Sequence, residues 1–109
     1  MNLREAILDH LKVTSPTFPE LVEHLDSAGF NCRGEQLIEP THNLLICLGV
    51  SEEFAQTIIA LRAEELVSLT QVSLLDYLIT SPSIPTLPIV DKNVKLDKPR
   101  WVPVRLNLI

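Results

Sequence analysis

Prolines divide this chain of 109 residues into a part that can form helices and a part that cannot. Most of its eight prolines follow residue 80, at Pro82, Pro85, Pro88, Pro99 and Pro103. Proline lacks the amide that a helix interior needs, and a proline at every third residue keeps a segment extended. We therefore expect one domain over residues 1–109, with a helical core over 1–80 and an extended, proline-rich segment over 81–109.

Two helices are predicted before residue 30. Apolar residues recur at helical spacing over residues 2–12, where Asn2 and Glu5 have the spacing of a capping box. A second helix is predicted to open at Thr17, which has the same spacing to Glu20. This helix should end before Gly29, because glycine readily takes the positive φ of a helix C-terminus.

The middle of the chain is harder to assign. Residues 30–42 fit either a brief strand or a loop, and a short apolar helix is predicted over 41–48. A long helix over 52–67 should follow Ser51, and a short one should cover 71–79. The long helix carries two adjoining apolar lines, so we expect it to be buried on two sides. Those lines consist of Phe54, Ile58 and Leu61, and of Ala55, Ile59 and Leu66.

The C-terminal segment has the composition of strands. Residues 87–90 and 101–109 are rich in β-branched side chains and partly alternate, which predicts a hairpin joined by the polar segment 91–99. Pro88 and Pro103 each remove a ladder donor, so both strands should be short or lie at an edge. The predicted fold class is mainly α with a C-terminal β-hairpin, an α+β domain.

Charge is unevenly distributed along the chain. The net charge is −5, but residues 1–90 hold four basic against twelve acidic residues, and residues 91–109 hold five basic against two. Affinity for nucleic acid comes from Lys and Arg that neutralise phosphates. This balance excludes a protein that coats nucleic acid with its whole surface. The C-terminal segment is then either a phosphate contact or a solvated tail.

The first ten residues contain acids and lack the apolar core of an export signal. The longest apolar run, over 44–50, is far shorter than the roughly 20 residues that span a bilayer. We therefore expect a cytoplasmic protein without a membrane contact.

Residues 44–59, LLICLGVSEEFAQTII, resemble a helix-turn-helix signature. Gly49 would allow the tight turn, Val50 would fill the angle between the helices, and Ser51 would cap the second helix. Residues 61–69 similarly resemble the end of a recognition helix that enters the first strand of a wing. With the predicted helices and hairpin, the chain resembles a winged-helix domain, and the resemblance implies that fold.

No pattern for catalysis or for binding a metal or cofactor emerges. Cys32 and Cys47 lack the local ligand pairs of a zinc site, and we expect two reduced, buried thiols. The acidic pairs at 52–53 and 64–65 are neighbours on predicted helices and point about 100° apart, which favours a solvated surface over a shared site. We predict no catalytic, metal or cofactor-binding residues and no enzymatic activity.

The strongest candidate contacts are the cations of the predicted wing and the tryptophan beside them, namely Lys92, Lys95, Lys98, Arg100 and Trp101. They fit a phosphate backbone or a protein partner, while Trp101 alone also fits a core position. Glu52 and Glu53 lie on the outward face of the long helix predicted over 52–67, which is the second helix of the helix-turn-helix resemblance. They disfavour DNA binding, because phosphates repel carboxylates. The leading hypothesis is a non-enzymatic interaction or assembly module of winged-helix type that forms a homodimer or binds another protein. The alternative is a DNA-binding transcriptional regulator that contacts the backbone through its basic wing.

Overall fold

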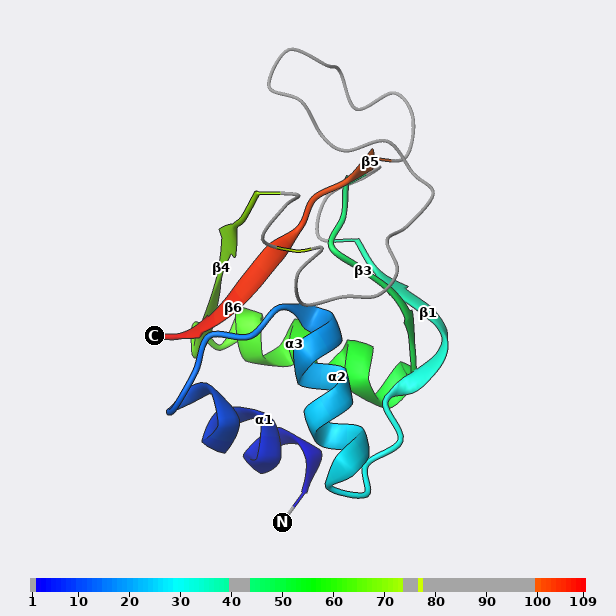
Figure 1. Cartoon of the computed structure of the whole chain (residues 1–109), viewed down its shortest axis with the longest axis vertical. Helices are drawn as coiled ribbons and strands as arrows, with labels where there is room; N and C mark the ends of the chain where they lie inside the picture. Colours follow the sequence, from blue (N-terminus) through cyan, green and yellow to red (C-terminus); the bar gives the residue numbers. More distant parts are fainter. Residues whose placement is uncertain (1, 40–43, 74–76, 78–99) are drawn as a thin grey trace.

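The computed structural model describes residues 2–39, 44–73, 77 and 100–109 as a small α+β domain (Figure 1). Within these ranges the three helices gather at one end, and the strand pairs β4–β6 and β1–β3 lie on either side of them. The elements in chain order are α1 (Leu3–Leu11), α2 (Phe18–Ser27), β1 (Arg33–Ile38), β2 (Leu44–Leu45), β3 (Cys47–Val50), α3 (Glu52–Ala63), β4 (Val67–Gln71), β5 (Arg100–Trp101) and β6 (Val104–Leu108).

Helices α1 and α2 form where the sequence predicts them. The Asn2 side chain accepts a hydrogen bond from the backbone N–H of Glu5 at 2.8 Å, and Thr17 and Glu20 form the predicted capping box. At the end of α2, Gly29 has a φ of +94° and Phe30 donates its N–H to the Leu25 carbonyl at 2.9 Å. This is the ending expected of a helix stopped by a left-handed glycine.

The predicted helix over 41–48 is wrong in its described part, because residues 44–45 and 47–50 form β2 and β3. β3 pairs antiparallel with β1, the segment that the sequence left open, with Leu48 opposite Leu37 and Cys47 opposite Ile38. A short apolar run has too few residues to distinguish a helical from a strand period. Pairing with β1 makes residues 47–50 a strand and not a helix.

Helix α3 begins after Ser51 as predicted but ends at Ala63 instead of at Val67. Glu65 takes a φ of +59°, and Leu66 donates its N–H to the Leu61 carbonyl at 3.0 Å. This left-handed turn redirects the chain into β4. This turn could not be predicted from the sequence, because the residue with the left-handed conformation is a glutamate and not a glycine.

The predicted C-terminal strand is present as β6, within residues 101–109. Its expected partner, residues 87–90, lies outside the described residues, and the described partner is β4, which pairs antiparallel with it. The predicted helix over 71–79 also falls mostly outside the described residues, but Gln71 belongs to β4. The two-residue strand β5 pairs in parallel with β2.

One apolar core lies between the helices and the inner faces of β1–β3 and β4–β6. Its largest fully buried side chains include Phe18, Phe54, Ile7, Leu21, Leu25, Ile58 and Leu106. Within the described residues, no helix is long and apolar enough to cross a membrane.

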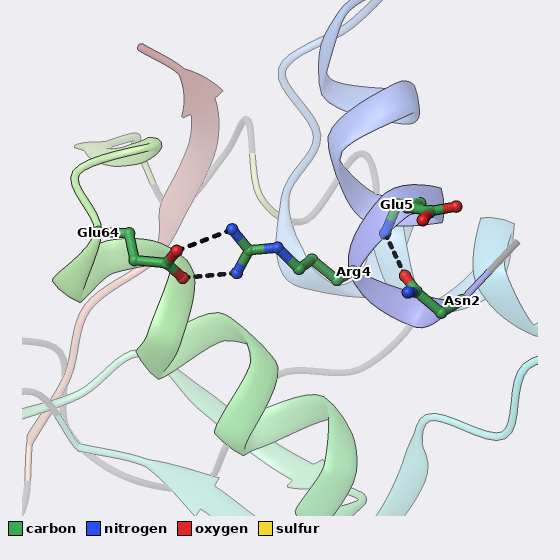
Figure 2. Close-up of polar contacts among 4 residues, drawn as sticks. All are labelled: Asn2, Arg4, Glu5 and Glu64. Carbon is green, nitrogen blue, oxygen red and sulfur yellow. Dashed lines mark hydrogen bonds and ion pairs between the residues drawn. The ribbon is translucent and has the colours of Figure 1, made fainter.

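An ion pair joins the first helix to the end of the third (Figure 2). The Arg4 guanidinium donates from Nη1 and Nη2 to the two carboxylate oxygens of Glu64, at 2.5 and 2.9 Å. Arg4 lies in the first turn of α1, and Glu64 caps the C-terminus of α3. The guanidinium lowers the pKa of the Glu64 carboxyl. This two-pronged contact links the two helices at the surface, where both side chains remain partly exposed.

Candidate interaction surfaces

The cations of the predicted wing are mostly beyond what the structure describes. Lys92, Lys95 and Lys98 lie outside the described residues. The backbones of Arg100 and Trp101 form β5 beside β2, while their side chains lie outside the described part. The hypothesis of a basic wing therefore stays a prediction.

The three residues of the predicted helix-turn-helix turn behave as expected individually but connect different elements. Gly49 has a φ of +71°, Val50 is 2% exposed, and the Ser51 hydroxyl accepts a hydrogen bond from the Phe54 N–H at 3.2 Å. The element before them is strand β3, so they form a strand-to-helix turn. The helix-turn-helix over residues 44–59 is wrong because its first helix is a strand.

The outer face of α3 is polar and exposed. Glu52, Glu53 and Gln56 are all exposed, and the Thr57 hydroxyl donates to the Glu53 carbonyl at 2.7 Å. Two carboxylates in the first turn suit the helix dipole. They also give this face a charge that phosphates repel.

Burial of α3 on a second side is incomplete. Ala55 is buried, but Ile59, which the sequence places on the same apolar line, is 49% exposed. The prediction that both lines are covered is therefore wrong at Ile59. This side chain is available at the surface in the described part of the chain.

The titratable residues of the described part form no cluster that could hold a metal ion. No three of its His, Cys, Asp and Glu side chains are grouped as metal ligands. Cys32 and Cys47 are buried free thiols. Burial raises the pKa of Cys47 to about 12, which keeps it protonated and weakly nucleophilic near neutral pH.

Two histidines that the sequence assigns to different helices are stacked. The rings of His10 on α1 and His24 on α2 lie 3.8 Å apart between centroids and 13° from parallel. Burial, and then the neighbouring His24, lower the pKa of His10, while Glu20 opposes the shift. The sequence contains no signal for this pair, because the contact depends on how α1 packs against α2.

Acid should weaken the fold through His10. Because the folded state lowers the pKa of His10, the unfolded chain takes up the proton first as the pH falls through about 6.5, the ordinary histidine value. Stability should therefore fall between about pH 7.5 and about pH 5. Urea unfolding of the wild type and of His10→Gln at both pH values measures this. The variant should lose less stability on acidification, and an equal loss would contradict the assignment.

Exposed leucines gather on the strand pair β1–β3. Leu37 and Leu48 lie directly opposite each other across the ladder, 46% and 38% exposed. On the other side of β1, an open depression of about 380 Å³ is lined by Ile38, Glu39, Ile59, Arg62 and Ala63. We call the exposed pair of Leu37 and Leu48 the hairpin surface, and the depression is a separate feature of the molecule. The sequence contains no signal for this pair, because the continuous apolar run over 44–50 does not distinguish an exposed side chain from a buried one.

The hairpin surface is apolar. It consists of two leucine side chains that lie directly opposite each other across the β1–β3 ladder. Apolar side chains that lie together at a surface are a common feature of interaction sites. Comparisons with protein-family models, curated proteins and solved structures found no match.

Proposed function

We propose that this domain is a non-enzymatic interaction and assembly module that forms a homodimer and binds a further protein through its hairpin surface. The observation that carries the proposal is the cross-strand pair of exposed leucines, Leu37 and Leu48. A contiguous apolar pair loses water when a partner covers it. The free thiols of Cys32 and Cys47 suit a reducing compartment, and we place the protein in the cytoplasm.

A winged-helix-like arrangement is part of the proposal for the C-terminal half. Helix α3 is followed by β4, which pairs with β6, and the basic segment 91–99 lies between these strands in sequence. A helix followed by two antiparallel strands with a charged connection supports that likeness. The preceding segment of β strands departs from a helix-turn-helix, so the likeness concerns α3 onward.

The test is a comparison of partner recovery by two surface variants. Cross-linking in the producing cells should recover a protein partner with the wild type and lose it with L37S/L48S. The control Val13→Ser alters another exposed apolar residue, 79% exposed and outside the hairpin surface, and should keep the partner. Both variants should stay within about 1 kcal/mol of the wild-type unfolding free energy. The proposal would be overturned if L37S/L48S recovered the partner as well as the wild type does, or if neither the wild type nor the variants recovered one.

The alternative is a DNA-binding regulator, favoured by the excess of basic residues in the C-terminal 19 positions. Fluorescence anisotropy with random duplex DNA separates the two. A regulator would bind with an affinity of roughly 10⁻⁴ to 10⁻⁶ M that weakens steeply with salt and disappears when Lys92, Lys95, Lys98 and Arg100 are replaced by Ala. We expect no such binding, because the exposed face of α3 is acidic.

A further inference from the structure

The sheet edge formed by β4 carries backbone groups that no described strand takes up. β4 and β6 form a two-stranded sheet with an unbroken register from Val67 to Gln71. The far edge of β6 is covered, because Leu106 donates its N–H to the Pro16 carbonyl at 2.9 Å. Figure 1 shows β4 with β6 on one side and no described element along the other. Among the described residues, β4 is the open edge of this sheet.

The bonds at the two ends of the ladder show which residues face the open edge. Ile109 donates its N–H to the Leu66 carbonyl, and Val72 donates to the Pro103 carbonyl, both at 3.0 Å. In an antiparallel strand, the backbone N–H and C=O groups of alternate residues bond to one neighbouring strand, and those of the residues between them face the opposite edge. The even-numbered residues of β4 therefore bond to β6. The residues whose N–H and C=O face outward are Val67, Leu69 and Gln71.

β4 lacks the features that usually protect an open strand. Its sequence, VSLTQ, contains no charged residue, proline or glycine, and its pairing with β6 has no bulge. Natural edge strands are typically protected by charges, prolines or bulges. Strand β1, an outer strand of the β1–β3 sheet, has such protection: it carries Arg33 and Glu35, and its register is irregular between Arg33 and Gln36. The contrast indicates that β4 is built to be paired.

We propose that a second copy of this chain pairs with β4 along this edge, antiparallel and with the two-fold axis at Leu69. The inference rests on the self-association proposed above and says where the two copies meet. In this register Val67 lies opposite Gln71 of the second copy, and Leu69 lies opposite Leu69 of the second copy. Every outward-facing residue meets another outward-facing residue, so the ladder is complete. The β4–β6 sheets of the two copies then become one sheet of four strands.

The side chains suit this two-fold contact. An isologous interface needs a surface that complements itself. On one face, Ser68 lies opposite Thr70 of the second copy, so no like charges meet. On the other face, Leu69 is half-buried against the core and meets its own copy, which removes more apolar surface from water. A shift by one residue would set outward-facing groups against groups already bonded to β6, and a shift by two would leave one of the three outward-facing residues of β4 in each copy outside the ladder.

Proline at position 71 tests the ladder directly. The Gln71 N–H faces the open edge, so Gln71→Pro removes no bond to β6 and is tolerated as an edge proline. Sedimentation equilibrium of the wild type at micromolar concentration should report about twice 12.2 kDa. Gln71→Pro should be a monomer with an unchanged circular dichroism spectrum, and the control Gln71→Thr should remain a dimer.

A pair of charged variants tests the register. S68K/T70K places like charges opposite each other across the proposed two-fold axis and should raise the dissociation constant about tenfold or more. S68K/T70E places opposite charges there and should keep the dimer. A wild-type monomer would overturn the proposed self-association together with this interface. A wild-type dimer that survives both Gln71→Pro and S68K/T70K would overturn only the β4 interface and leave self-association standing.

Discussion

Replacing Phe54 by alanine should remove a substantial part of the folding free energy of this domain. Phe54 is fully buried on α3, and its ring meets the Phe18 ring of α2 edge to face, with centroids 6.2 Å apart and planes at 75°. A buried Phe→Ala change costs about 3–5 kcal/mol through lost transfer energy and a residual cavity. Small domains are stable by only about 5–15 kcal/mol in total. The midpoint of urea unfolding is therefore expected to fall well below that of the wild type.

Urea unfolding at a fixed protein concentration measures the effect. The matched control is Ile59→Ala on the same helix, because Ile59 is 49% exposed and should cost less than about 1 kcal/mol. A double-mutant cycle with Phe18→Leu and Phe54→Leu should report about 0.5–1.5 kcal/mol of coupling between the rings. Equal losses for Phe54→Ala and Ile59→Ala would show that the core is not organised around Phe54.

The three helices and the C-terminal strand are the parts of the fold that can be predicted from the sequence. The helices α1, α2 and α3 each carry their own start signal, at Asn2, Thr17 and Ser51, and an apolar period long enough to be unambiguous. The C-terminal strand is readable from its β-branched composition. Such features are local, so neighbouring residues are sufficient to specify them.

The features that the sequence conceals depend on contacts between distant residues. Residues 47–50 become strand β3 because β1 pairs with them, and residues 44–45 become β2 beside β5. β4 begins at Val67 because Glu65 takes a left-handed conformation. The candidate surfaces follow the same division. The exposed pair of Leu37 and Leu48 exists only once β1 and β3 are in register, and the open edge of β4 only once β6 has taken its other side.

Replacing Gly34 by alanine should be costly for a reason that its backbone angles do not reveal. A Cβ at Gly34 would lie 2.8 Å from the Val50 carbonyl oxygen and 3.0 Å from the Ser51 Cα. Both obstacles are backbone atoms, which cannot move aside as a side chain does. The crowding arises where the irregular register of β1 brings Gly34 against the turn into α3. We expect a loss of about 1–3 kcal/mol, typical of overpacking.

Gly29 provides a contrasting control, because nothing lies within 4 Å of its added Cβ and its cost comes from a φ of +94°. Gly29→Asn should be milder than Gly29→Ala, since asparagine tolerates the left-handed region, whereas at Gly34 asparagine should be no better than alanine. Hydrogen exchange gives a local readout at the Ser51 N–H, which donates to the Cys32 carbonyl at 2.8 Å. Gly34→Ala should speed exchange at Ser51 more than Gly29→Ala does. Wild-type stability in Gly34→Ala would mean that β1 does not pack this closely against the start of α3. The strand pair that carries the hairpin surface would then lack its attachment to the helical core.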